Sequence, residues 1–301
     1  MGNMGETFAI ETSELRKRYG NIEALRALNM QVPKGSIYGF LGRNGAGKTT
    51  AMKILLGMVR PDSGTARVCG LNAASARESL EIRKLVSFVD EEKDLYPGMT
   101  VDGMIRFTRG FYPGWRRDLE ERYARTFALQ PDQEVKKLSR GTRTKLALLL
   151  ALCRGAKVMI LDEPTSALDP AAADEILQAL VRAAAEQGTT IFFSSHQIAE
   201  VEQIADHVGI IDRGQTVVAG EIEDLRVQYR RIQLVFASSA PTEPLRAPGV
   251  VRSRRDGRSL TLLSSAGSER VIEEARAWNP VSVDVTPVTL REIFLETVQE
   301  N

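Results

Sequence analysis

A glycine-rich loop that ends in lysine and threonine is the clearest chemical feature of the sequence. It spans Gly42–Thr49 and reads Gly-Arg-Asn-Gly-Ala-Gly-Lys-Thr. This pattern fits a phosphate-binding loop, in which glycines let backbone N–H groups turn towards phosphate oxygens. In such a loop Lys48 reaches the β- and γ-phosphates, and the hydroxyl of Thr49 ligates Mg²⁺. The residues predicted to bind the nucleotide here are Gly42, Asn44, Gly45, Ala46, Gly47, Lys48, Thr49 and Thr50.

Two adjacent carboxylates, Asp162 and Glu163, directly follow the apolar run Val158–Leu161. Asp162 is expected to hold Mg²⁺, and Glu163 is expected to orient and polarise an attacking water as the general base. Acidic residues often follow strands without any chemical role, so the pair alone also fits a solvated strand end. Together with the glycine-rich loop, the pair predicts hydrolysis of a nucleoside triphosphate.

Short apolar runs predict the strands and the helix that position these groups. One buried strand, Ile37–Leu41, precedes the loop, and an apolar helix, Ala51–Leu56, follows it. Further buried strands are predicted at Val158–Leu161 and Thr189–Phe193. Continuous apolar runs suit strands that are covered on both faces, and their alternation with helices is typical of a mostly parallel sheet. The predicted fold class is therefore α/β.

The segment before the predicted strand Val158–Leu161 is predicted to be helical. Residues Tyr96–Arg154 are expected to form a helical insert, with Thr100 as an N-cap and a densely apolar helix at Leu146–Leu152. The alanine-rich, amphipathic segment Asp174–Glu186 is predicted to be the crossover helix that leads into the strand Thr189–Phe193.

The pattern changes after about Leu225, which predicts a large nucleotide-binding domain at residues 1–225 and a small α+β domain at 226–301. The turn Arg255–Arg258 lies between two apolar runs and predicts a tight hairpin. The other elements expected in this domain are a strand through Ile232, Leu234 and Phe236, a loop at Pro241–Pro248, a helix at Glu269–Trp278, a strand at Val281–Val285 and a helix at Leu290–Val298.

Several motifs along Phe8–Leu225 together resemble the ATP-binding-cassette family. Asp162–Asp169, read as Asp-Glu-Pro-Thr-Ser-Ala-Leu-Asp, resembles the Walker B and D-loop sequence, and Leu138–Thr142 resembles the signature sequence of that family. Ser194–His196 is similar to the segment that carries its switch histidine, and Tyr19 matches the aromatic residue that stacks on adenine. The order of these motifs is that of the family.

The resemblance implies a P-loop nucleotide-binding cassette, with a RecA-like core and a helical insert, that hydrolyses ATP with Mg²⁺. It implies that His196 contacts the γ-phosphate and holds Glu163 and the water in line, alongside Lys48 as a catalytic group. It also implies that two cassettes pack head to tail, as a homodimer or a heterodimer. Ser139 and the Gly141 N–H would then bind the γ-phosphate held by the phosphate loop of the partner cassette.

Two positions depart from the family pattern. Arg140, Gly141 and Thr142 stand where the family usually has Gly-Gly-Gln, so Arg140 either points into solvent or adds a charge to the bound nucleotide. Glu91 aligns with a glutamine that contacts Mg²⁺ and the transmembrane partner, and a carboxylate is a stronger Mg²⁺ ligand than an amide oxygen. Glu91 is therefore included among the metal ligands with Thr49 and Asp162.

Composition and charge narrow the choice of partners. The chain has 301 residues and a formal net charge of +1, so no nucleic-acid partner is expected.

Cys69 and Cys153 are far apart and the chain has 2 histidines, so no zinc site is expected, and both thiols are predicted to be buried in a reducing cytosol. Met1–Glu14 lacks the features of a secretory signal, and no run approaches the roughly 18 apolar residues of a spanning helix.

These observations favour a transport ATPase that works with a separate transmembrane permease and lies in the cytoplasm, peripheral on the inner face of the cell membrane. Leu95–Pro97 and Leu290–Leu295 resemble bacterial exporter ATPases for drugs, antibiotics or peptides. The alternative is a soluble cassette protein that acts on ribosomes or DNA, although such relatives carry two cassettes or a long coiled coil. The C-terminal domain either has a structural role, covering the cassette or steadying the dimer, or regulates the protein through dimerisation or a ligand.

Overall fold

The computed structural model describes residues 7–242, 247–265 and 268–298. The chain divides into two compact units, Met1–Thr216 and Val217–Asn301. Residues 1–6 of the N-terminal segment and 243–246 of the loop predicted at Pro241–Pro248 lie outside the described residues. Within the described ranges, no helix is long and apolar enough to cross a membrane.

A six-stranded sheet with strand order β10-β9-β3-β8-β7-β6 positions the motifs of the first unit. Its strands are β3 (Ile37–Leu41), β6 (Val86–Val89), β7 (Val158–Leu161), β8 (Thr190–Ser195), β9 (His207–Asp212) and β10 (Gln215–Glu221). From β9 to β6 the neighbouring strands run parallel, and every residue of β3, β7 and β8 is buried. The predicted α/β class and its three buried strands are confirmed, with β8 one residue later at its start.

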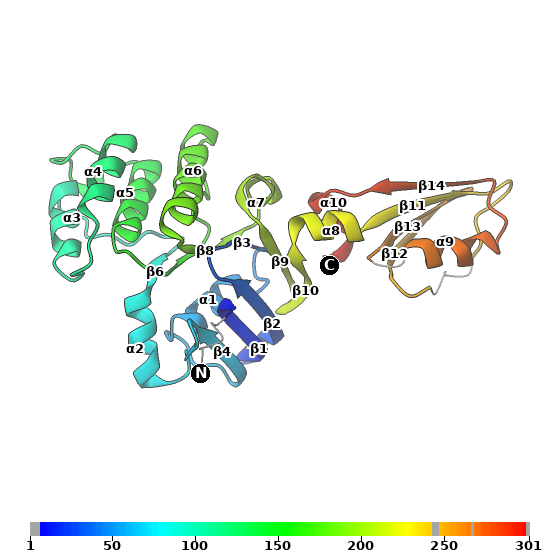
Figure 1. Ribbon diagram of the computed structural model, residues 1–301, viewed down its shortest axis with the longest axis horizontal. Coiled ribbons are helices and arrows are strands. Elements are labelled where there is room, and N and C mark those ends of the chain that lie inside the picture. The colour runs from blue at the N-terminus through cyan, green and yellow to red at the C-terminus, as the bar shows by residue number, and fades with distance from the viewer. Residues whose placement is uncertain (1–6, 243–246, 266–267, 299–301) are drawn as a thin grey trace, which may run out of the picture. The chain divides into compact units, whose positions relative to one another are not determined.

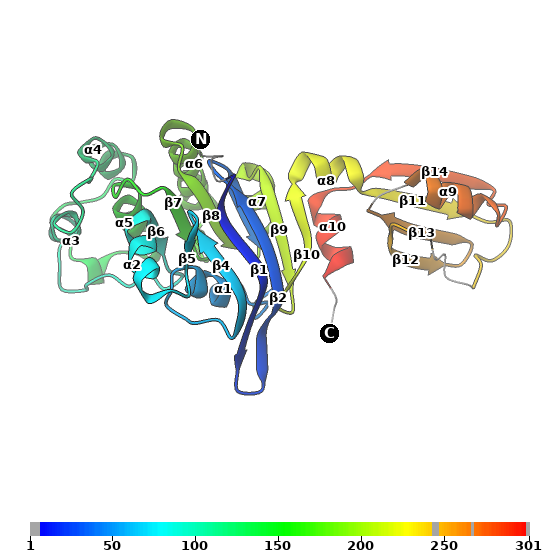
Figure 2. The ribbon, with the colours of Figure 1, turned by 60° about the horizontal axis from the view of Figure 1, so that its bottom comes forward.

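A second, four-stranded sheet has the order β2-β1-β4-β5, and the pairs β1–β2, β1–β4 and β4–β5 are antiparallel. Its strands are β1 (Phe8–Tyr19), β2 (Ile22–Pro33), β4 (Ser63–Val68) and β5 (Leu71–Asn72). Figure 2 shows β1 and β2 as a long hairpin. This antiparallel sheet was not predicted. Bulges at Glu14 and Ala27, with φ of 49° and 69°, interrupt the apolar alternation by which its strands would be found in the sequence.

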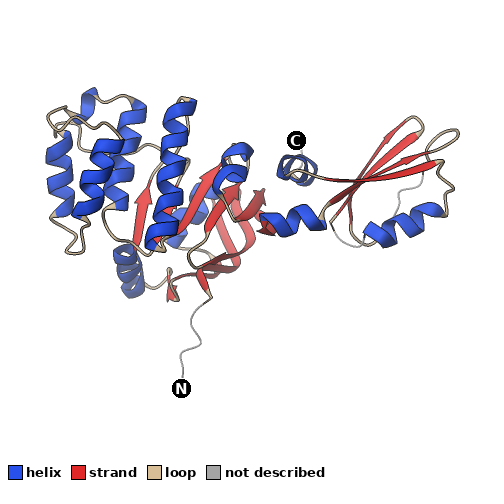
Figure 3. Ribbon diagram, turned by 45° about the horizontal axis from the view of Figure 1, so that its top comes forward, coloured by secondary structure: helices blue, strands red, loops and turns tan. Residues whose placement is uncertain are grey.

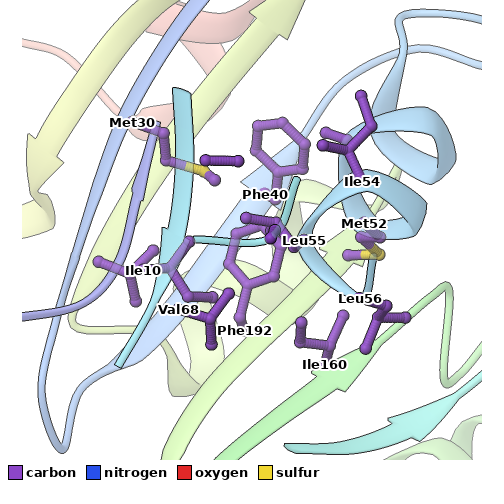
Figure 4. Packing of buried hydrophobic residues seen from close by; sticks show 14 of the residues in the cluster. Ile10, Met30, Phe40, Met52, Ile54, Leu55, Leu56, Val68, Ile160 and Phe192 are labelled. Carbon is purple, nitrogen blue, oxygen red and sulfur yellow. The ribbon is translucent and has the colours of Figure 1, made fainter. Parts of the chain in front are cut away.

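The core of the first unit joins the two sheets through α1 (Lys48–Leu55). Figure 4 shows Phe40 of β3 and Phe192 of β8 beside Met52 and Leu55 of α1, with Ile10 of β1 on the opposite side. The rings of Phe40 and Phe192 lie 5.3 Å apart. Full burial of each such side chain contributes roughly 1.5–3 kcal/mol, so the strand before the phosphate loop and the helix after it are both firmly anchored.

Helices cover the parallel sheet and form the predicted insert. They are α2 (Ala76–Leu85), α3 (Val101–Arg109), α4 (Arg117–Thr126), α5 (Arg140–Leu152), α6 (Pro170–Gln187) and α7 (Ile198–Ile204), with a 3₁₀ turn at Val135–Lys137. Figure 1 shows α3, α4 and α5 grouped together. The predicted N-cap is confirmed, since Thr100 Oγ1 accepts a hydrogen bond from Gly103 N at 3.0 Å. The crossover helix is α6, which begins earlier than predicted because Asp169 caps it and Pro170 opens it.

The second unit contains an antiparallel sheet with strand order β12-β13-β11-β14. Its elements are α8 (Ile222–Gln228), β11 (Arg230–Val235), β12 (Val250–Asp256), β13 (Ser259–Ser264), α9 (Ser268–Arg276), β14 (Ser282–Pro287) and α10 (Leu290–Thr297). Figure 3 shows helices and strands of this unit in separate colours. Ile232 and Leu262 of the sheet form a buried cluster with Val271 of α9. The predicted hairpin is confirmed, with Gly257 at φ 55° in its turn.

The two cysteines differ in their surroundings. Cys153 is buried, and burial raises the pKa of its thiol. Cys69 is only partly buried and has φ of 49°, because it lies in the turn between β4 and β5. The expectation of two buried thiols is therefore wrong for Cys69.

Candidate functional site

The phosphate loop leaves β3 and enters α1, and its shape requires two of its glycines. A Cβ on Gly47, where φ is 109°, would lie 2.6 Å from the carbonyl oxygen of Ala24. A Cβ on Gly42 would lie 2.7 Å from the side chain of Ile211. The loop encloses Lys48, whose buried Nζ donates a hydrogen bond to Gly42 O at 2.7 Å. The loop therefore holds its lysine in place through its own backbone.

Asp162 links the phosphate loop to the end of the central strands. It follows β7 and is buried, with 1% of its surface exposed. Its Oδ2 accepts a hydrogen bond from Thr49 Oγ1 at 2.7 Å, and its Oδ1 accepts one from Ser194 Oγ at 2.6 Å. Parallel strands end at the same edge of a sheet, so β7 and β8 deliver Asp162 and Ser194 to one place.

Glu163 lies between a lysine and a histidine. Its Oε1 is 3.2 Å from Lys48 Nζ, and its Oε2 is 2.8 Å from His196 Nδ1. A carboxylate can only accept hydrogen bonds, so His196 donates its Nδ1–H here. The backbone of Glu163 is left-handed, with φ of 46°, and its N–H donates to Ser194 Oγ at 2.8 Å. Such a conformation is costly for a residue with a side chain, and it occurs often at functional sites.

A cavity of about 300 Å³ opens in front of these groups. It brings together most of the predicted site residues, namely Asn44, Gly45, Gly47, Lys48, Thr49, Thr50, Glu91, Asp162 and Glu163. It is also lined by four residues that were not predicted to belong to the site, namely Arg43 of the loop and Ile22, Glu23 and Ala24 at the start of β2. Ile22, Glu23 and Ala24 begin three residues after Tyr19, the predicted adenine-stacking residue, so their proximity in sequence could have indicated a place in the site.

Six predicted residues do not line this cavity. Gly42 and Ala46 belong to the phosphate loop and His196 contacts Glu163, whereas Tyr19, Ser139 and Gly141 lie elsewhere. Tyr19 is 46% exposed, and its ring centroid is 5.3 Å from Lys17 Nζ. Ser139 is exposed and caps α5, since its Oγ accepts a hydrogen bond from Thr142 N at 3.1 Å. Gly141 follows in the first turn of the same helix. Within this chain, the signature segment and the phosphate loop therefore line different surfaces.

Lys93 also contacts the site and was not predicted from the sequence. Lys93 is buried, with 4% of its surface exposed, and its Nζ donates a hydrogen bond to the carbonyl oxygen of Glu163 at 3.1 Å. Burial lowers the pKa of Lys93 from its ordinary value, and the nearby charge of Arg140 lowers it further. A lysine within the charged run Asp90–Asp94 gives no sequence signal of burial.

Comparisons with known proteins identify the family of this chain. The family model described as ABC transporter matches residues 25–166. The bacitracin transport ATP-binding protein BcrA of Enterococcus faecalis is 35% identical over 226 residues, covering 74% of this chain and 73% of that protein. The daunorubicin resistance ATP-binding protein DrrA2 of Streptomyces coeruleorubidus is 33% identical over 291 residues, covering 94% of this chain and 85% of that protein.

A solved structure of an ABC transporter component has the same fold as this chain. The structure of cbiO1 from Clostridium perfringens, described as part of the ABC transporter complex cbiONQ, matches with a TM-score of 0.63 at 26% identity. The match covers 72% of this chain and 89% of that chain. The chain therefore belongs to the ATP-binding proteins of the ABC transporter family. It binds ATP and is an ATPase, as the resemblance implied.

Proposed function

We propose that this chain is the ATP-hydrolysing subunit of an exporter, located on the cytoplasmic face of the cell membrane and coupled to a separate transmembrane permease. The observation that carries the catalytic part is the position of Glu163 between Lys48 and His196, at the mouth of the phosphate loop. The names of two relatives, for bacitracin transport and daunorubicin resistance, support export as the transport direction.

The phosphate loop would bind the β- and γ-phosphates of ATP. Lys48 supplies a buried ammonium, and the N-terminal N–H groups of α1 supply donors with a partial positive charge. Thr49 and Asp162 fit Mg²⁺, because they place a hydroxyl and a carboxylate oxygen 2.7 Å apart, and Glu91 adds a carboxylate to the same cavity. When bound, Mg²⁺ neutralises charge on the β- and γ-phosphates.

Glu163 would accept a proton from the attacking water as the general base. His196 donates one ring N–H to Glu163, which fixes the orientation of the imidazole and leaves its other nitrogen free to contact the γ-phosphate. Ser194 holds both Asp162 and the Glu163 N–H, so the groups proposed for metal binding and for proton transfer keep a fixed separation.

The site would be completed by a second cassette, either another copy of this chain or a different one. Ser139 and the Gly141 N–H lie at the exposed N-terminus of α5, where an anion from a facing subunit can approach. Tyr19 would stack on adenine from the exposed end of β1. The domain limits 1–225 and 226–301 remain part of this proposal.

Replacement of Glu163 by glutamine tests the catalytic assignment. Glu163→Gln keeps the size of the side chain and removes the base, so turnover should fall by on the order of 10²–10⁴-fold while ATP binding persists. Hydrolysis is measured by phosphate release, nucleotide binding by fluorescent ATP, and trapping of a closed dimer by size-exclusion chromatography with ATP. Turnover near that of the wild type would show that Glu163 is not the base.

Co-purification tests the partner. A tagged chain solubilised in mild detergent should bring down a membrane protein with several spanning helices. Recovery of ribosomes or DNA instead would favour the other class, a cassette protein that acts on nucleic-acid machinery.

A further inference from the structure

The loop after β6 buries one lysine among acidic neighbours that remain accessible. In the segment Asp90–Asp94, Glu91 and Glu92 are exposed, whereas Lys93 is 4% exposed. The backbone of Lys93 is left-handed, with φ of 51°, and its N–H donates to Asp90 O at 3.2 Å. The loop therefore turns back on itself and directs this lysine inwards.

Lys93 contacts the main chain of the proposed general base. Its Nζ donates to Glu163 O at 3.1 Å, and the same carbonyl accepts a hydrogen bond from Ser166 N at 3.2 Å. On the other side of the residue, the Glu163 N–H donates to Ser194 Oγ. The left-handed backbone of Glu163 is thus held at both of its peptide groups, which compensates for its unfavourable φ.

Stability alone does not account for this lysine. Within the described part of the chain, Lys93 Nζ forms no ion pair, so its charge is buried against a single carbonyl. Buried charges of this kind cost free energy and are concentrated at functional sites.

We propose that Lys93 is a positioning residue for ATP hydrolysis, which acts by fixing the main chain of Glu163 so that its carboxylate stays aligned with the attacking water. The proposal rests on the proposed role of Glu163 as the base. Lys93 belongs to the same loop as Glu91, which lines the phosphate cavity. Any movement of that loop therefore changes the support of Glu163 at the same time as the position of Glu91.

The first test replaces Lys93 by methionine, which is unbranched like lysine and one atom shorter, and which removes its charge and its donors. We expect Lys93→Met to lower kcat by about 10-fold, the lower end of what loss of a supporting hydrogen bond costs at such a centre, with the KM for ATP unchanged. Lys145→Met is the matched control, since Lys145 is also largely buried but pairs with Glu175. Equal loss of ATP binding and of turnover in Lys93→Met would overturn the proposal.

A second variant keeps the donor and the charge. Lys93→Arg should recover turnover to well above that of Lys93→Met, because a guanidinium also donates to a carbonyl. Turnover as low as in the methionine variant would overturn the role of the donated hydrogen bond.

A double-mutant cycle shows whether Lys93 acts through Glu163. In a Glu163→Gln background, adding Lys93→Met should reduce the residual turnover by less than about 2-fold, because the group that Lys93 positions is already disabled. A full, multiplicative loss would mean that Lys93 acts independently, which would overturn the proposal. If Lys93→Met hydrolyses ATP normally while Glu163→Gln does not, only the role of Lys93 fails. Normal turnover in Glu163→Gln would overturn both roles.

Discussion

The phosphate loop and the signature segment are both expected to contact a γ-phosphate, but the first is packed within the chain and the second is exposed. In the phosphate loop, Lys48 is buried and the loop lines a cavity with Asp162 and Glu163. In the signature segment, Ser139 is exposed, and among the described residues its side chain bonds only to Thr142 in the same helical turn. One segment is therefore organised by the chain itself, and the other presents its polar groups to something outside it.

The contrast comes from packing and not from local chemistry. Both segments precede a helix, so each has N–H groups and a partial positive charge that suit a phosphate. At α1, backbone atoms of Ala24 and Ile211 close around the loop, and only glycines fit. At α5, a Cβ added to Gly141 would meet its nearest neighbour at an ordinary 3.7 Å. The phosphate loop is therefore shaped by contacts within its own chain, whereas the signature segment leaves space for the second subunit that we propose.

Among the tests of this contrast, the largest effect is expected from a negative charge in the signature segment. Ser139→Asp keeps a good N-cap for α5, so the helix should remain as stable, but its carboxylate would repel a γ-phosphate offered by a partner. Hydrolysis should fall by roughly 10²–10³-fold, the scale of losing one group that stabilises the developing negative charge. The measurement is the rate of phosphate release at saturating ATP.

The control for Ser139→Asp is nucleotide binding by the monomer at low protein concentration. That affinity should not change, because Ser139 does not line the cavity of its own chain. A parallel fall in monomer affinity would mean that Ser139 serves the phosphate loop of its own chain, and the contrast between the two segments would fail.

A smaller effect is expected inside the organised segment, at Ser194. Ser194→Ala removes the hydrogen bond to Asp162 and the acceptor for the Glu163 N–H, so turnover should fall by about 10-fold and more Mg²⁺ should be needed. Ser87→Ala is the matched control, because Ser87 is equally buried but donates to Ala151 O. If both variants lose the same activity, the loss reflects general destabilisation of the sheet.

The parts of the fold that the sequence predicted are those with a strong local pattern. The runs Ile37–Leu41 and Val158–Leu161 are continuously apolar, which is the pattern of strands buried on both faces, and both appear at the predicted residues. The antiparallel sheet was missed because β1 mixes charged residues with apolar ones and changes register between Thr12 and Leu15. Such irregular pairing is decided by tertiary contacts and leaves no simple period.

In the site, too, the residues with a strong local motif were predicted and those placed by tertiary contacts were not. The contacts of Thr49 and Glu163 follow from motifs whose spacing reflects chemistry, so these residues were identified in advance. Lys93 was not, because the charged run around it is typical of a solvated loop, and only the fold turns its side chain towards Glu163. Ile22 was not predicted to line the phosphate cavity for a similar reason, since its place there depends on how the β1–β2 hairpin packs against the phosphate loop.

The smallest predicted effect concerns the cation in the signature segment. Arg140 is the first residue of α5, where the helix dipole disfavours positive charge, and its charge also disfavours the buried ammonium of Lys93. Arg140→Gln should therefore raise the free energy of unfolding by about 0.3–0.5 kcal/mol, a value at the low end because Arg140 is exposed. Urea unfolding measures the change. Lys53→Gln is the control of opposite sign, since Lys53 lies in the last turn of α1, where the dipole favours a cation. If both variants lose stability, Arg140 has a stabilising partner within its own chain, and the signature segment is less open to a second subunit than its exposed surface indicates.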